Sequence, residues 1–133
     1  MRAKKAKVTR AIPVGARIVC ADNTGAKILK VIGVKGYRPT RRRIPAAGVG
    51  DVVICSVVSG KPDLKHKVVQ AVIIRQRKEY RRPDGTRIKF SDNAAILFNL
   101  DKEEPLGSEI KGPVAREVLE RFPEVGSCAS KVV

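Results

Sequence analysis

Residues 68–98 read VVQAVIIRQRKEYRRPDGTRIKFSDNAAILF, two apolar runs separated by a basic segment. The runs 68–74 and 94–98 are short and rich in β-branched or apolar residues, which favours strands over helices. The Pro83-Asp84-Gly85 tripeptide between them is typical of a tight turn, because proline presets the first turn position and glycine tolerates positive φ. The stretch therefore predicts two buried strands joined by a strongly basic hairpin.

Short apolar runs separated by turn-forming residues continue through the rest of residues 13–100. No helical periodicity interrupts residues 13–100, and the absence of intervening helices favours a small antiparallel barrel or sandwich. Several runs are apolar at nearly every position, so both of their faces must be covered, by barrel closure or by a segment packed outside. The predicted strands are 17–21, 27–35, 51–59, 68–74, 86–90 and 94–98.

One helix is predicted, over 112–123. Pro113 suits a first helical turn, where its missing N–H costs nothing, and Pro123 ends the helix. Apolar residues fall on one face of this helix at positions 114, 118, 119 and 122.

Net charge is the strongest functional signal, with 28 basic and 13 acidic residues giving +15. A protein so charged repels itself unless an anionic partner neutralises it; nucleic acid is the first candidate and an anionic membrane the second. No apolar run is long enough to span a bilayer, and the N-terminal residues lack the apolar core of a signal peptide, so we expect no membrane partner.

The charge is unevenly distributed along the chain. Residues 1–100 carry 23 basic and 6 acidic side chains, whereas residues 101–124 carry 4 basic and 7 acidic ones. This asymmetry predicts two kinds of partner, an anion for the first part and a protein for the second.

Three basic clusters, in the N-terminal arm, the loop near residue 40 and the hairpin, favour RNA binding through phosphate and sugar contacts. Arginine dominates the two internal clusters, and its planar fork binds phosphate in bidentate fashion. Tyr37 and Tyr80 lie beside these clusters, where each either stacks on an unpaired base or packs against the barrel. The candidate RNA contacts are Lys4, Lys5, Lys7, Arg38, Arg41, Arg42, Arg43, Arg75, Arg77, Lys78, Arg81, Arg82, Arg87 and Lys89.

Catalysis finds no support in the sequence. The cysteines Cys20, Cys55 and Cys128 are odd in number and widely spaced, so Cys20 and Cys55 are interpreted as buried apolar residues of a reduced, cytoplasmic protein. The single histidine, His66, has no cysteine or histidine partner at zinc-binding spacing. We therefore expect no enzyme activity, no metal and no cofactor.

Residues 71–74 (AVII) are followed after nine residues by Asp84-Gly85, after four by Phe90, after two by Asn93 and after two by Ile96-Leu97. This order and spacing resembles the signature of the universal large-subunit ribosomal protein fourteen family, which usually has Val where Ile96 stands. The basic arm and the RPTRRRIP loop resemble its archaeal and eukaryotic branch. Further matches cover 21–26 (ADNTGA), 48–51 (GVGD), 80–85 (YRRPDG), Gly107 and 112–115 (GPVA).

The resemblance implies a mainly β fold: a five-stranded antiparallel β-barrel with a basic hairpin extension and a short C-terminal helical segment. It implies a structural role in the large ribosomal subunit, with large-subunit rRNA, neighbouring ribosomal proteins and, through intersubunit bridges, small-subunit rRNA as partners. The family's C-terminal region also receives anti-association factors, which implies initiation factor six for this branch. A bacterial-type silencing contact is not expected, because bacterial members often have Arg where Glu109 stands.

We expect a single domain with an arm at 1–12, a barrel at 13–100 and a C-terminal loop and helix at 101–133. The alternative function is a free RNA-binding barrel, such as a translation factor or an RNA chaperone. Reversing the charge of Glu117 and Glu120 is expected to weaken factor docking without weakening RNA binding. The candidate protein contacts are Ser108, Glu109, Glu117, Glu120 and Arg121.

Overall fold

Five strands form a closed β-barrel in the computed structural model, which describes residues 8–36 and 43–133. The order around the barrel is β9-β2-β3-β5-β6, and β6 returns to pair with β9. All neighbours are antiparallel except β2 and β9, which run parallel with Val19 opposite Ala94. The barrel strands are β2 (Arg17–Cys20), β3 (Ala26–Val34), β5 (Val52–Gly60), β6 (Val68–Arg75) and β9 (Ala94–Asn99).

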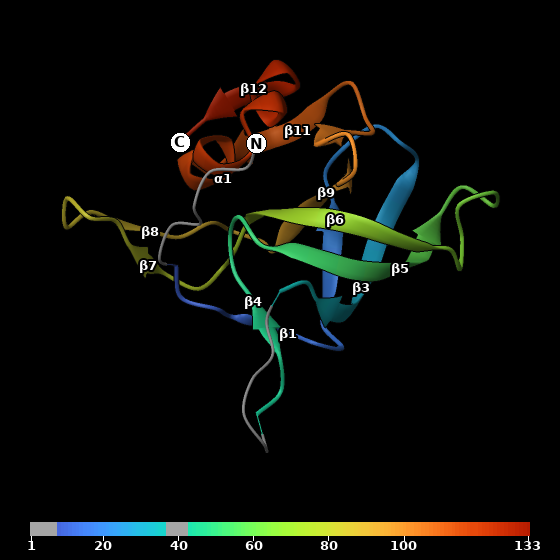
Figure 1. Ribbon diagram of the computed structural model, residues 1–133, viewed down its shortest axis with the longest axis horizontal. Helices are drawn as coiled ribbons and strands as arrows, with labels where there is room; N and C mark the ends of the chain where they lie inside the picture. Colours follow the sequence, from blue (N-terminus) through green and yellow to red (C-terminus); the bar gives the residue numbers. More distant parts are fainter. Residues whose placement is uncertain (1–7, 37–42) are drawn as a thin grey trace.

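Smaller elements surround this barrel (Figure 1). The short strands β1 (Ile12–Pro13) and β4 (Ala46–Ala47) pair with each other in a separate two-stranded sheet. Strand β10 (Glu104–Pro105) pairs with β9 and extends the barrel sheet. The hairpin of β7 (Tyr80–Arg81) and β8 (Arg87–Ile88) projects from one side of the molecule. The predicted mainly β fold with a basic hairpin and a short helical segment is confirmed.

The C-terminal segment, residues 101–133, lies against the barrel at the top of Figure 1. It contains a parallel pair of strands, one helix and a 3-10 turn. The ring of Phe122 lies 4.9 Å from that of Phe98 on β9, and the N–H of Ala115 donates to the carbonyl of Ile74 on β6. Besides β10, its elements are β11 (Ile110–Val114), α1 (Arg116–Arg121), η1 (Pro123–Ser127) and β12 (Ala129–Val132).

This packing explains the continuous apolar runs at 71–74 and 94–98. All nine of these side chains are buried, because one face lines the barrel and the other is covered from outside. The core joins barrel and C-terminal segment into one apolar cluster. As expected, both faces of these strands are covered, one by closure of the barrel and the other by the C-terminal segment packed outside it.

The predicted helix boundaries are wrong at the N-terminal end. Gly112 has φ of +79°, which no helix accommodates, and Pro113 lies in β11 opposite Lys131 rather than in a first helical turn. The helix begins at Arg116 and spans six residues. Pairing with β12 overrides the local helical pattern, although Val114, Val118 and Phe122 are buried as predicted.

Across the described ranges 8–36 and 43–133, no helix is both long and apolar enough to cross a membrane.

Candidate nucleic-acid interface

The basic hairpin, residues 78–90, is closed by the predicted tight turn. The N–H of Gly85 donates to the carbonyl of Arg82 at 2.9 Å, and Gly85 has φ of +92°, which favours glycine. The carboxylate of Asp84 accepts a hydrogen bond from the N–H of Thr86 at 2.9 Å. Proline, aspartate and glycine therefore each serve the reversal in the way the sequence predicts.

The two strands of this hairpin present arginines side by side to solvent. Arg81 pairs directly with Arg87 across the ladder, and both are exposed, as is Lys89. Like charges placed opposite one another destabilise a hairpin. The exposed carboxylate of Glu79 lies 3.4 Å from Arg87 and offsets little of this repulsion in water. An anion bound across the pair would remove it.

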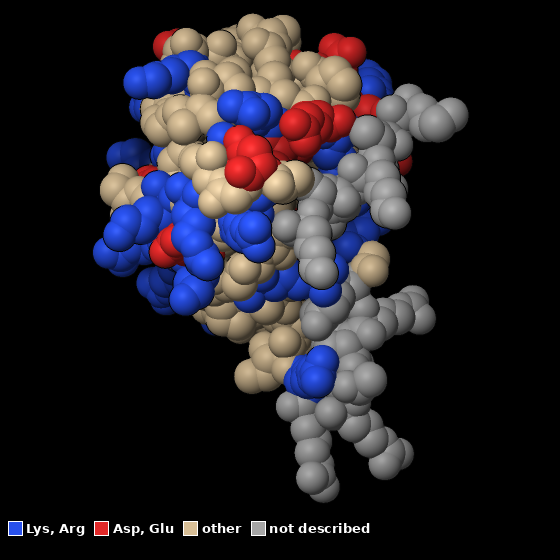
Figure 2. Space-filling model, turned by 90° about the vertical axis from the view of Figure 1, so that its left-hand side faces the viewer, with Lys and Arg blue, Asp and Glu red and all other residues tan. Residues whose placement is uncertain are grey.

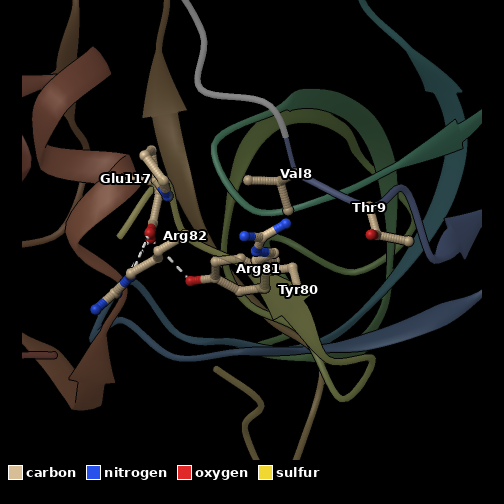
Figure 3. Close-up of a pocket in the computed structure, with 7 residues that line it drawn as sticks. Val8, Thr9, Tyr80, Arg81, Arg82 and Glu117 are labelled. Atoms are coloured by element: carbon tan, nitrogen blue, oxygen red, sulfur yellow. Dashed lines mark hydrogen bonds and ion pairs between the residues drawn. The ribbon is translucent and has the colours of Figure 1, made fainter. Parts of the chain in front are cut away.

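Arg82, in contrast, points inward and does not project from the hairpin beside Arg81, Arg87 and Lys89. Its Nε donates to Glu117 Oε1 at 2.6 Å, and its Nη2 donates to Glu117 Oε2 at 3.3 Å and to the carbonyl of Val133 at 2.6 Å. Figure 3 shows Glu117 between Arg82 and the hydroxyl of Tyr80, which donates to Oε2 at 2.8 Å. Alternation along β7 produces this arrangement, because successive side chains point to opposite faces.

The pKa values of Glu117, Arg82 and Tyr80 are all shifted in this buried cluster. Burial alone would raise the pKa of Glu117, but the hydrogen bonds from Arg82 and Tyr80 outweigh it and hold the pKa below its ordinary value of 4.5. The hydrogen bond to Glu117 raises the pKa of Arg82, and burial followed by the same carboxylate raises the pKa of Tyr80. The carboxylate and guanidinium are thus both charged at neutral pH.

Arg75 is a second predicted RNA contact that the fold uses internally. Its Nε donates to Asp92 at 2.9 Å, and its Nη1 donates to the carbonyls of Lys111 and Pro113 at 2.8 and 3.0 Å. Only 7% of the residue is exposed. A Cβ on Gly112 would lie 2.6 Å from Arg75 Nη1, so the glycine makes room for this bridge between β6 and β11.

The other predicted RNA contacts divide into two groups. Arg43, Arg77 and Lys78 are exposed, like Arg81, Arg87 and Lys89 on the basic hairpin. Tyr80 is 2% exposed, which leaves its ring no room to stack on a base. Tyr37 and the remaining candidates, Lys4, Lys5, Lys7, Arg38, Arg41 and Arg42, lie outside the described residues.

A cationic loop between β5 and β6 was missed by the sequence reasoning. This lysine loop, residues 61–67 (KPDLKHK), carries exposed Lys61, Lys65, His66 and Lys67 and lies at the end of the barrel opposite the basic hairpin (Figure 1). None of its three lysines pairs with a carboxylate among the described residues. The three lysines of this stretch are visible in the sequence, but their exposure together at one end of the barrel is not.

The lysine loop is held in one conformation by backbone hydrogen bonds. The N–H groups of Leu64 and Lys65 both donate to the carbonyl of Lys61, and the N–H of His66 donates to that of Val57. Leu64 packs on the core, while His66 adopts φ of +69°, an uncommon conformation for a residue other than glycine. The loop therefore presents its cations from a fixed platform.

The predicted protein contacts also divide by burial. Glu109 and Glu120 are exposed, and exposed Ser108 exchanges hydrogen bonds with Asn23 at 2.8 and 2.9 Å. Glu117 is 7% exposed, and its carboxylate is bound to Arg82 inside the protein. Arg121 donates to the carbonyl of Gly50 at 2.8 Å and thereby ties the helix to the barrel.

Charge on the hairpin side of the molecule is predominantly positive. Figure 2 looks at this side and shows Lys and Arg gathered around its middle, with a smaller group of acidic side chains above them. The side therefore combines a cationic area with an acidic one, in agreement with the charge asymmetry of the sequence.

No metal or thiol site emerges from the part of the chain that the structure describes, where no group of three His, Cys, Asp or Glu residues gathers. All three cysteines are free thiols, and Cys20 and Cys55 are buried as predicted. Burial raises the pKa of each of these two thiols to about 12, so both are protonated and unreactive near neutral pH.

A closed five-stranded barrel with exposed cations at opposite ends defines a class of small basic structural proteins. Within that class, residues 11–133 match the family model described as ribosomal protein L14p/L23e. The chain belongs to this family, which consists of structural ribosomal proteins and not of enzymes.

Relatives from archaea agree with this assignment. The chain is 58% identical to large ribosomal subunit protein uL14 of Thermoplasma volcanium over 124 residues, 93% of each chain. It is 55% identical to that of Halorubrum lacusprofundi and 51% identical to that of Methanoregula boonei, both over 133 residues and 100% of each chain. The predicted family and branch are thereby confirmed.

Arg75 and Arg77 provide a matched test of internal and external arginines. We expect Arg75→Gln to lower the free energy of unfolding by about 3 kcal/mol, because it leaves Asp92 and two carbonyls without their donor. Arg77→Gln should change it by less than about 0.5 kcal/mol, because Arg77 is exposed. Urea unfolding followed by circular dichroism measures both, and equal losses would contradict the distinction.

The loss of folding stability at acidic pH should report the ionisation of Glu117. Because its folded pKa lies below 4.5, the carboxylate contributes stability that is complete above this pH and is lost as the pH falls through the folded value. The wild type should therefore lose stability more steeply than Glu117→Gln between about pH 5 and about pH 3. Thermal midpoints across this range measure the difference, and parallel pH profiles would show that Glu117 makes no such contribution.

Proposed function

We propose that this protein is a structural constituent of the large subunit of the cytoplasmic ribosome and binds rRNA with both ends of its barrel. The observation that carries this proposal is the pair of exposed cationic sites, the basic hairpin and the lysine loop, on opposite ends of one barrel. Family membership supports the ribosomal role over that of a free RNA-binding module.

The basic hairpin supports phosphate binding through two arginines. Arg81 and Arg87 face each other across β7 and β8, and two adjacent guanidinium groups suit the closely spaced phosphates of an RNA backbone. Arg77, Lys78 and Lys89 extend the same exposed stretch. Contacts of this kind recognise the shape of RNA more than its sequence.

The lysine loop supports a second contact at a distance from the first. Its lysines are exposed and the backbone that carries them is hydrogen-bonded, so little backbone freedom is lost when they meet phosphate. A barrel with cations at both ends is suited to connect two RNA segments. We include small-subunit rRNA across the subunit interface among the partners, together with large-subunit rRNA, on the strength of the family resemblance.

Two triple variants test this assignment. Changing Arg81, Arg87 and Lys89 to Gln, or Lys61, Lys65 and Lys67 to Gln, should weaken binding to deproteinised large-subunit rRNA. The slope of log affinity against log salt should lose about 2 units of magnitude in each case, because fewer counterions are released. Filter binding across a salt series measures the slope, which for the wild type should exceed a magnitude of about 3.

The matched control removes the same number of charges from the C-terminal segment, by changing Lys102, Lys111 and Lys131 to Gln. These three lysines are also exposed. If this control weakens binding as much as the two test variants, RNA responds only to net charge and the assignment of the two ends is wrong.

The C-terminal segment is proposed to face proteins, namely neighbouring ribosomal proteins and the anti-association initiation factor six. Its acidic balance supports this, as do exposed Glu109 and Glu120 and the exposed apolar side chains of Leu106 and Val132. Leu106 is 55% and Val132 is 49% exposed, which suits apolar contact with a protein and serves no purpose toward phosphate.

Charge reversal should separate this face from the RNA-binding ends. Changing Glu109 and Glu120 to Lys is expected to weaken initiation factor six binding at least about tenfold, because like charges at an interface repel. Rim charges act mainly through the association rate, so surface plasmon resonance is the suitable measurement. The equivalent change of Asp63 and Glu79 to Lys is the control and should leave factor binding intact; equal loss in both would overturn this docking face.

A further inference from the structure

The short length of the basic hairpin raises the question of what holds it in place. Its ladder consists of two residue pairs, Tyr80 with Ile88 and Arg81 with Arg87. A two-stranded ribbon this short is not stable in water without support. At its base, the N–H of Phe90 donates to the carbonyl of Gln76 at 3.0 Å, but this bond lies before the first ladder pair.

Support beyond the base comes from a carboxylate on another element. Glu117 of α1 accepts hydrogen bonds from Tyr80 and Arg82, the residues immediately before and after Arg81. Both of its oxygens are occupied by these two side chains. Figure 3 shows the anchor, with Tyr80 and Arg82 turned toward Glu117 and Arg81 directed elsewhere.

This arrangement fixes the direction of the exposed arginines. Side chains alternate along a strand, so holding Tyr80 and Arg82 inward forces Arg81 outward. Arg87 follows, because it is the ladder partner of Arg81. Without the anchor, repulsion between the two guanidinium groups would spread the strands.

We propose that Glu117 is a positioning residue for RNA binding: a carboxylate of the C-terminal helix that orients the arginines of the basic hairpin without touching RNA. The inference rests on the proposed RNA-binding function. It also makes the hairpin and α1 one mechanical unit, although they were predicted to serve different partners. Arg82 reinforces the link through its hydrogen bond to the carbonyl of Val133 at 2.6 Å.

A double-mutant cycle separates this role from a purely structural one. Glu117→Gln is combined with the hairpin triple variant, in which Arg81, Arg87 and Lys89 are changed to Gln. In the wild-type background, Glu117→Gln should weaken affinity for deproteinised large-subunit rRNA about tenfold at a temperature where circular dichroism shows the folded protein. In the triple background it should have no further effect, because the side chains it positions are already gone.

The matched control is Glu124→Gln, an exposed carboxylate next to the same helix, which should leave affinity unchanged. Tyr80→Phe removes one hydrogen bond and keeps the ion pair, and should weaken binding about threefold. It keeps the inference testable if Glu117→Gln does not fold. Hydrogen exchange of the amides in 81–87 should accelerate in both anchor variants and not in the control.

Each outcome has a distinct meaning. If the hairpin triple variant binds RNA as well as the wild type, the proposed function of the hairpin fails. If the triple variant is weakened but Glu117→Gln and Tyr80→Phe are not, the positioning inference alone is overturned. An equal effect of Glu117→Gln in both backgrounds would likewise overturn it, because the loss would then arise elsewhere in the fold.

Discussion

Strand β9 is the element on which the rest of the molecule depends. It pairs in parallel with β2 and antiparallel with β6, and so closes the barrel. Its backbone is also held from the side, because Asp22 accepts a hydrogen bond from the N–H of Leu97 at 2.9 Å. Phe98 then provides the ring on which Phe122 packs. The C-terminal segment thus packs on the same strand that closes the barrel.

The cations of this protein fall into two groups according to the nearest carboxylate. Arg75 and Arg82 have one within hydrogen-bonding distance, and they serve as internal ties. The hairpin and lysine-loop cations have no strong internal partner, and the barrel region has only 6 acidic residues to offer. Two of these, Asp22 and Asp51, accept hydrogen bonds from nearby backbone N–H groups. The surplus charge is thus left for an external anion.

The sequence predicted the barrel strands well because their signal is local. Runs of β-branched residues bounded by turn formers mark β3, β5 and β6 to within one residue at each end. The hairpin turn follows from Pro83, Asp84 and Gly85 for the same reason. Barrel closure was not derivable in this way, since the parallel partner of β2 lies far along the chain, and it entered through family resemblance.

The sequence alone did not allow us to predict which arginines are buried. Alternation directs the side chains of Arg81, the last residue of β7, and of Arg82, which follows it, to opposite sides of the hairpin, but nothing local tells which of them faces inward. The deciding carboxylate, Glu117, lies 35 positions away from Arg82. The predicted start of the helix was wrong for a related reason. Gly112 and Pro113 lie in β11 because this segment pairs with β12, which follows the helix in the sequence.

The parallel pairing of β2 with β9 has a consequence for synthesis of the chain. Contacts between distant segments form slowly, because the loop between them must be closed first. Until residue 99 has been made, β2 and β6 each lack the neighbour that β9 provides, and open strand edges invite association between chains. The excess of 23 basic over 6 acidic residues in 1–100 keeps incomplete chains apart during this interval. The same cations that we propose to bind RNA thus also oppose association between free chains.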